Sequence, residues 1–455
     1  MNSEWTQAYA GSKEIWSYLV RVSKKYGIYE RARFNTEVLS CKWIEAERKW
    51  HIETESKDGT KDLLVVDFCV SGIGALHVPL YPEVPGIGSF KNGQEIHSAE
   101  WRNDVDCKNK RIVVVGSAAS AVQIVPSIAE VAKQVTCIQR TPNWLAPQKG
   151  PVLPFSLKYG PFIRWCFRNL PGALLLHRFF IYCMMEGAHF PLGLFSGGVD
   201  GIGQQIARKT LTKYMMYQLN GNKDLADKVI PKFAVGCKRI IRSERFLPAL
   251  AKDHVELVTD KLTRVESNGV VLETKQGPRK IEADMIIYAT GYRVGSLGRM
   301  SLRGCNDHVA TGHDLVEKAV DTYYGMCNPL YPNAFLMLGP NTGLGHNSVI
   351  IMIETQANYI AKAIELAADE NIERLSVKMD EVDKCMKFVN TTMDTAVWKA
   401  GHCHSYYQNK DGKVPTIWPA TTVRYMADCA PPSDLSTFDC VKKGQQMRQH
   451  EVAKI

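Results

Sequence analysis

The sequence lacks any apolar run long enough to cross a membrane. Its N-terminus has no signal-peptide apolar core, and the most apolar run, residues 170–185, is interrupted by His177 and Arg178. We therefore expect no integral membrane segment and a cytoplasmic protein. Residues 170–185 are expected to form a buried core helix. The alternative is a helix on a membrane surface, which would imply peripheral membrane association.

Paired cysteine spacings and blocks of basic residues are also missing. The 13 cysteines are scattered and odd in number, which favours free thiols in a reducing compartment over a disulfide framework. The net charge of +9 is modest for 455 residues, so nucleic acid is not an expected partner. His402, Cys403 and His404 have no partner cluster at ligand spacing, and we expect no metal site there.

What the sequence does contain is organised around residues 111–142. Residues 111–115 form a β-branched run without polar interruption, as a parallel strand buried on both faces requires. Gly116 follows directly and permits a tight turn, Ala118 stands where backbone must approach a pyrophosphate, and Ala121 packs helix on strand. The pattern predicts a βαβ dinucleotide-binding unit whose helix N-terminus supplies amides to phosphate. An ordinary βα turn is the alternative.

The end of the second strand, residues 134–139, indicates which dinucleotide binds. A ribose 2′-hydroxyl requires Asp or Glu at that point, but the sequence has Gln139, Arg140 and Thr141. A cation at this position suits a 2′-phosphate. We therefore predict NADP rather than NAD.

The rest of the chain alternates helical and strand-rich segments. We expect an amphipathic helix over residues 12–27, strands over 34–39, 49–54 and 63–70, a mainly helical region over 150–230, and strands over 255–288. The strand 285–288 ends in an Ala-Thr-Gly-Tyr element at a sheet's carboxyl edge, where open α/β folds place ligands. A second glycine-rich loop, residues 339–348, precedes a long apolar helix. This loop either approaches a ligand or is a plain turn.

Together these segments resemble the flavin-dependent monooxygenases with two dinucleotide-binding domains, most closely the Baeyer–Villiger monooxygenases. The resemblance spans nearly the whole chain and is carried by GSFKNGQEIHSAEW, GSAASAVQIVPSIA, GCKRIIRS, ATGY, GPNTGLGHNS and IWPATTVRY. The first of these segments corresponds to the family's linker fingerprint. Gly93, His97 and Trp101 occur there at the family's spacing. Phe90 stands one residue too far upstream, and Arg102 replaces the usual Pro or Asp. Oxidation of a soft nitrogen or sulfur atom is therefore an alternative to ketone oxidation.

The resemblance implies an α/β fold with two Rossmann-like dinucleotide-binding domains and a helical insertion. Residues 1–78 and 291–455 would form the FAD domain, 79–110 a linker, and 111–290 the NADP domain, including the helical region 150–230. NADPH would reduce FAD, and reduced flavin would take O₂ to a C4a-peroxide. The substrates implied are O₂ and a small ketone, amine or sulfide.

The resemblance also assigns roles to single residues. Arg239 matches the family's active-site Arg, whose permanent cation would stabilise an anionic peroxyflavin, with a surface basic pair as the alternative. His97 matches a residue that couples domain movement to catalysis, with a hydrogen-bonded linker His as the alternative. The residues expected at NADP are Gly116, Ser117, Ala118, Ser120, Ala121, Arg140, Thr141 and Lys238. The residues expected at FAD are Val38, Gly291, Asn341, Asn347 and Ser348.

One family segment has no counterpart in this sequence. Family members open with a strand and a GxGxxG loop that seats the FAD diphosphate, whereas residues 1–75 resemble the part that follows them, as though the first βαβ unit had been cut away at Met1. We therefore expect the chain, taken from Met1, to hold FAD poorly or not at all. The alternative to an enzyme is that the chain is a non-catalytic remnant that binds NADP.

Overall fold

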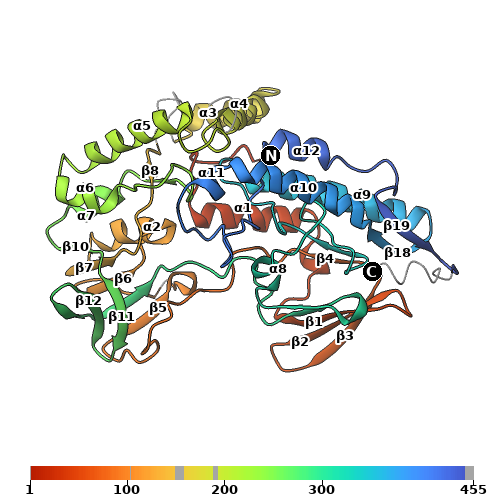
Figure 1. The fold of residues 1–455 in the computed structure, drawn as a ribbon, viewed down its shortest axis with the longest axis horizontal. Coiled ribbons are helices and arrows are strands. Elements are labelled where there is room, and N and C mark those ends of the chain that lie inside the picture. Colours follow the sequence, from red (N-terminus) through yellow and green to blue (C-terminus); the bar gives the residue numbers. More distant parts are fainter. Residues whose placement is uncertain (1, 103, 149–157, 188–192, 446–455) are drawn as a thin grey trace.

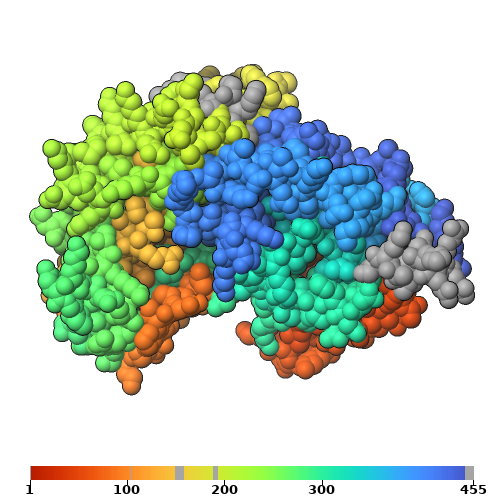
Figure 2. Space-filling model, in the orientation of Figure 1, coloured from red at the N-terminus to blue at the C-terminus, as the bar shows by residue number. Residues whose placement is uncertain are grey.

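The computed structural model describes residues 2–102, 104–148, 158–187 and 193–445. Figure 1 places a parallel sheet with its helices in one half of the molecule and a second set of sheets and helices in the other half. Figure 2 shows the surface hollowed between these two halves. The arrangement confirms the predicted α/β fold with two Rossmann-like parts.

The first half is built on a five-stranded parallel sheet. Its strands, in spatial order, are β10 (Val255–Val258), β7 (Gln134–Ile138), β6 (Arg111–Val115), β14 (Met285–Tyr288) and β5 (Gln94–His97). Two helices pack beside the sheet, α2 (Ala119–Ile128) and α7 (Phe246–Leu250). The predicted βαβ unit and the strand 285–288 are confirmed. Residues 94–97, expected within a linker, add the edge strand of this sheet.

A small antiparallel sheet and a helical region complete this half. The sheet consists of β11 (Lys261–Glu266), β12 (Gly269–Thr274) and β13 (Gly277–Glu282). The helices are α3 (Pro161–Asn169), α4 (Ala173–Gly187), α5 (Ile202–Gln218) and α6 (Lys223–Val229), with the short parallel pair β8 (Leu145–Ala146) and β9 (Ile241–Arg242) beside them. The predicted helical region is confirmed in its described parts; residues 150–157 and 188–192 lie outside the described residues.

The second half contains three further sheets. The largest has the order β16 (Val309–Thr311), β15 (Ser301–Arg303), β1 (Thr36–Ile44), β2 (Lys49–Ser56) and β3 (Lys61–Val66). The other two are the parallel pair β4 (Cys69–Ser71) and β17 (Ala334–Leu336), and the antiparallel pair β18 (Ile372–Val377) and β19 (Phe438–Lys442). The helices are α1 (Ser12–Lys25), α8 (Asp314–Glu317), α9 (Val349–Asp369), α10 (Met379–Thr395), α11 (Val397–Ala400) and α12 (Thr422–Asp428).

The single strand expected over residues 63–70 is wrong, because the chain changes sheets there. β3 pairs with β2, whereas β4 pairs with β17. Asn333 stabilises the chain between the two strands. Its side-chain amide donates to the carbonyl oxygen of Asp67 (2.8 Å), and its backbone carbonyl accepts from the Cys69 N–H (2.9 Å). The residues 63–70 are apolar apart from Asp67, and this local pattern does not show that the chain changes its pairing partner.

The expectation that residues 170–185 form a buried core helix is also wrong. They fall largely within α4, where Glu186 is the only buried residue and Leu175, Leu176 and Phe179 are exposed. Hydrophobic content without a clear period cannot indicate which face of a helix is covered. Within the described ranges, no helix combines the length and apolar character needed to cross a bilayer.

The expectation that all cysteines are free thiols is wrong for one pair. Cys237 and Cys403 form a disulfide across 166 residues of sequence, and the other 11 cysteines are free. No short spacing marks this pair, because the fold alone brings it together. Apart from it, no group of three or more His, Cys, Asp or Glu in the described part of the chain is arranged to hold a metal ion.

The disulfide leads to a stability prediction. Reduction is expected to lower the free energy of unfolding by about 2–4 kcal/mol, because the bond closes a long loop in the unfolded chain. Denatured, unreduced protein should titrate 11 thiols. Urea unfolding with and without dithiothreitol measures the effect, and a Cys237→Ser variant should be insensitive to the reductant. Thirteen thiols in the unreduced protein would contradict the assignment.

Candidate active site

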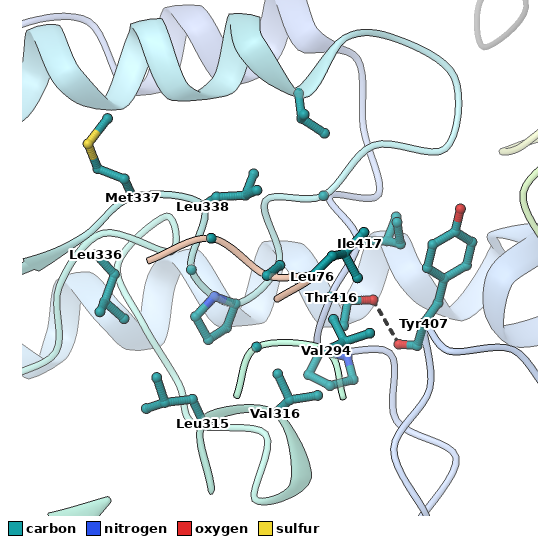
Figure 3. A pocket seen from close by; sticks show the side chains of 18 of the residues that line it. Leu76, Val294, Leu315, Val316, Leu336, Met337, Leu338, Tyr407, Thr416 and Ile417 are labelled. Carbon is teal, nitrogen blue, oxygen red and sulfur yellow. Dashed lines mark hydrogen bonds between the residues drawn. The ribbon is translucent and has the colours of Figure 1, made fainter. Parts of the chain in front are cut away.

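A cavity opens where β4 and β17 end. Because the two strands are parallel, their carboxyl ends lie at one edge, and each continues into a glycine-rich loop. The cavity has a volume of about 280 Å³. Figure 3 shows side chains from several segments around it, and most are apolar: Leu76, Val294, Leu315, Val316, Leu336, Met337, Leu338 and Ile417. Such a lining suits a flat, largely apolar group.

Arg239 is the one charged side chain among the described residues that line the cavity. Tyr406 and Tyr407 line it as well. Burial raises the pKa of Tyr407 well above its usual value, and the positive charge of Arg239, which lines the same cavity, opposes that rise. Arg239 is exposed, but on the side that faces the apolar cavity its guanidinium is less screened than in bulk water. It can therefore stabilise negative charge that develops there.

The backbone before Arg239 is tightly held. Cys237 is fully buried and bonded to Cys403. Gly236 has a φ of +87°, and a Cβ at this position would lie 2.6 Å from a ring carbon of Phe195. These restraints position the tract from which the Arg239 side chain extends.

The loop after β6 is shaped by close contact with β14. Gly116 has a φ of +114°, and a Cβ there would lie 2.4 Å from the carbonyl oxygen of Ala289. The glycine is therefore required by the neighbouring strand as well as by the turn. Ala121 is fully buried and packs α2 into the core beneath the sheet.

The first turn of α2 is open to a ligand. Its N-cap, Ala118, is exposed and has no side chain to bond the first backbone N–H groups, which suits an anion at the helix N-terminus. Ser120 is half-buried in this turn. Ser117 is buried, and its hydroxyl donates to the carbonyl oxygen of Thr141 (3.3 Å), which ties this loop to the end of β7.

Two cations lie together beyond the end of β7. Burial and the neighbouring charge of Arg140 lower the pKa of Lys238 to about 8. Arg140 is exposed, and in the part of the chain that the structure describes neither cation has a carboxylate ion-pair partner. An anion placed between them would relieve their repulsion.

His97 lies at the carboxyl end of β5, paired in register with Tyr288 of β14. It is fully buried, and its Nδ1 accepts from the Ala99 N–H (3.1 Å). Burial lowers its pKa, whereas Glu100 and the backbone of Gly291 act in the opposite direction. His97 and Gly291 are thus brought together, but neither is among the described lining residues of the cavity.

The polar residues expected near FAD make structural contacts in the second glycine-rich loop. The amide of Asn341 donates to the carbonyl oxygens of Val414 (2.9 Å) and Ile417 (3.2 Å). Ser348 caps α9 by accepting from the Ile350 N–H (3.3 Å). Neither Asn341 nor Ser348 is among the described cavity-lining residues, whereas their loop neighbours Gly339, Pro340, Gly343 and Leu344 are. Val38 is exposed on β1 and is not among the lining residues either.

Asn347 reveals a residue that sequence reasoning missed. Its amide donates to Glu186 of α4 (2.7 Å), which also accepts from the backbone N–H (2.7 Å) and hydroxyl (2.8 Å) of Thr422. Burial acts to raise the pKa of Glu186, but hydrogen bonds from His346, Asn347 and Thr422 lower it to about 2. The carboxylate therefore links α4 to the second glycine-rich loop. Glu186 could have been noticed in the sequence because it is the first acidic residue after residues 131–185, which contain no Asp or Glu.

The cavity also uses residues to which the sequence analysis assigned no site role. Ser71 ends β4, and it forms one wall of the cavity together with Ile73, Gly74 and Leu76, which follow the strand. The available signal was their position: a glycine-rich exit from a strand, like the exit after β14. Tyr407 is another lining residue that was not predicted, and its backbone carbonyl accepts from the Thr416 hydroxyl (2.9 Å, Figure 3).

Comparison with known proteins gives a consistent result. The sequence model of the family described as flavin-binding monooxygenase-like matches residues 3–151. A Baeyer–Villiger monooxygenase from Pseudomonas aeruginosa is 33% identical over 432 residues, which cover 94% of this chain and 77% of that protein. A Baeyer–Villiger monooxygenase from Streptomyces coelicolor is 31% identical over 427 residues, with coverages of 93% and 78%.

Solved structures share the fold. Cyclohexanone monooxygenase from Rhodococcus, bound to NADP⁺, superposes with a TM-score of 0.81 at 21% identity over 96% of this chain and 86% of that chain. OTEMO in complex with FAD and NADP has a TM-score of 0.82, with the same identity and coverages. By its sequence identity to curated enzymes over most of both chains, this chain belongs to the flavin-dependent monooxygenases that include the Baeyer–Villiger monooxygenases.

Proposed function

We propose that this chain uses NADPH and FAD to insert one oxygen atom from O₂ into a ketone. The observation that carries the proposal is the position of Arg239, whose cation stands at an apolar cavity formed at the carboxyl ends of β4 and β17. The Baeyer–Villiger names of the relatives support a ketone as substrate. Family membership accounts for the monooxygenase chemistry.

The cavity fits the ring of a flavin. Its walls are mostly apolar, and Gly343 lets the loop pack closely, since a Cβ there would lie 2.7 Å from the carbonyl oxygen of Thr416. Bound there, FAD would supply two chemical abilities that no side chain has, acceptance of a hydride from NADPH and activation of O₂. The expected weak retention of FAD stays a prediction, and flavin absorbance per chain measures it.

The chain's own residues would position the substrate and stabilise charge. Leu76, Val294 and Leu338 would exclude water from the reacting atoms, which strengthens the field of a nearby cation. Arg239 would hold the ketone oxygen and stabilise the negative charge that develops on it. We assign His97 the role of linking movement of β5 to the segment after β14, which contains Gly291.

The loop after β6 and the two cations would bind NADPH. The open first turn of α2, with Ser120 and the backbone of Gly116 to Ala118, would bind the diphosphate. Arg140 and Lys238 would bind the 2′-phosphate, and Thr141 stands beside them on the segment tied to Ser117.

The lowered pKa of Lys238 predicts that NADP⁺ affinity depends on pH. With a pKa of about 8, Lys238 is mostly protonated at about pH 7 and mostly neutral at about pH 9, so affinity should fall roughly tenfold over that interval. Lys238→Arg keeps its charge throughout and should remove the dependence. Calorimetric titration at both pH values is the measurement, with NAD⁺ as the control ligand. An affinity that is constant with pH in the unmutated protein would show that Lys238 does not contact the phosphate.

Oxidation of a soft nitrogen or sulfur is the second candidate, favoured by the displaced Phe90 and by Arg102 in the fingerprint. Product analysis separates the two. Protein supplied with FAD and NADPH is given a cyclic ketone or a thioether, and we expect the lactone from the ketone. A sulfoxide without any lactone would replace the ketone proposal. Bound flavin with no NADPH-dependent oxygen uptake would support the non-catalytic alternative.

A further inference from the structure

Helices α3 and α4 form a hairpin with an unusually apolar outer surface. The exposed residues, called here the hairpin patch, are Phe162, Trp165, Leu170, Leu175, Leu176, Phe179 and Phe180. Phe162 is 74% exposed and Leu176 is 69% exposed, which is rare for side chains of this kind. Figure 1 places both helices at one edge of the molecule. Clustered exposed apolar residues of this extent mark an interaction surface.

The inner side of the hairpin already has partners. The hydroxyl of Tyr159 and Nε2 of His177 are 3.0 Å apart, and Phe167 packs against both rings with centroid distances of 5.5 and 5.0 Å. At the base of α4, the hydroxyl of Tyr182 bonds that of Thr422 (2.9 Å). Glu186 anchors the same end, as described above. The hairpin is therefore fixed to the body, and its outer side is the part left exposed.

The hairpin's own residues carry charge of one sign. Residues 158–185 contain four basic residues, Lys158, Arg164, Arg168 and Arg178, and no Asp or Glu. Arg168 is paired with Glu4 from the N-terminal segment (2.7 Å). Arg178 is exposed and directly precedes Phe179 in α4. Aromatic and leucine side chains beside arginines are typical of helices that lie in the headgroup region of a bilayer.

We propose that the hairpin patch binds the surface of a membrane that contains anionic phospholipids. The helices have 9 and 15 residues, too short to span the hydrocarbon core, so they lie in the interface. The apolar side chains enter the acyl boundary while the arginines meet the lipid phosphates. A symmetric pairing of two copies through this patch is disfavoured, because it would place the same cations opposite one another.

Vesicle flotation tests the proposal. The protein is mixed with vesicles of phosphatidylcholine alone or of phosphatidylcholine with phosphatidylserine. We expect it to float with the mixed vesicles, less so at high salt, and only weakly with phosphatidylcholine. Leu176→Glu with Phe179→Glu should lower the partition coefficient by about tenfold or more. Leu63→Glu with Val65→Glu changes two similarly exposed residues on β3, at 50% and 51%, and should leave flotation unchanged.

Further measurements distinguish loss of binding from loss of fold. Each variant should keep the circular dichroism and the NADP⁺ affinity of the unmutated protein, because its sites lie on the surface. Arg178→Glu removes little apolar area, so it should lower flotation on the anionic vesicles much more than on phosphatidylcholine. The proposal is overturned if the unmutated protein does not float, or if the Leu176 and Phe179 variant floats equally well. It is also overturned if the patch instead holds a dimer that this variant dissociates in sedimentation analysis.

Discussion

Arg239→Ala is expected to abolish oxygen transfer to the substrate while NADPH oxidation continues. Reduction of the flavin requires only that the hydride donor be close, whereas oxygen transfer requires a fixed cation where negative charge develops. Removal of one such preorganised group typically costs about 10²–10³ in rate. The electrons from NADPH should then appear as hydrogen peroxide in solution. Product yield, NADPH consumption and peroxide are measured on the same flavin-loaded sample.

Arg242→Ala is the matched control for this experiment. Arg242 lies three residues along the same tract, is exposed, donates to the carbonyl oxygen of Pro147 (3.0 Å), and is not among the described lining residues of the cavity. It should leave the product yield unchanged. An Arg239→Ala protein that oxygenates at the normal rate would show that Arg239 has no catalytic role.

Arg140→Ala is expected to weaken NADPH binding by one to two decades and to leave NADH binding nearly unchanged. The loss of a charge-assisted contact to the 2′-phosphate corresponds to about 1.5–3 kcal/mol. Only NADPH carries that phosphate, so the ratio of the two affinities isolates the contact. Fluorescence titration with both cofactors measures it.

Lys133→Ala provides the control for Arg140. Lys133 is exposed and immediately precedes β7, at the opposite end of that strand from Arg140. Its removal changes the net charge equally but should not alter the ratio of NADPH to NADH affinity. Equal affinity for the two cofactors in the unmutated protein would refute the assignment of Arg140.

The features that could be predicted from sequence are those encoded over short spacings. The β-branched run 111–115 followed by Gly116 could be recognised as a strand and turn because the residues that cooperate are neighbours in sequence. Even there, one reason why position 116 requires glycine could not be seen in the sequence. The close approach of Ala289, more than 170 residues away, requires it as much as the turn does.

The features that could not be predicted depend on contacts between distant segments. Cys237 and Cys403 meet only because the segments that carry them pack together in the fold. The exposure of Leu176 on α4 could not be read from hydrophobicity, because burial depends on what packs against the helix. The break between β3 and β4 follows from Asn333, which is 266 residues from Asp67 in sequence and hydrogen-bonds to Asp67 and Cys69.

The proposed oxygen insertion is tested most directly with isotopically labelled oxygen. The protein, supplied with saturating FAD, is given NADPH and a cyclic ketone under ¹⁸O₂, and bound flavin is measured in the same sample. We predict a lactone that carries a single ¹⁸O atom, formed in proportion to the NADPH oxidised. An unlabelled lactone, or no oxygenated product from a sample with flavin bound, would contradict the proposed function.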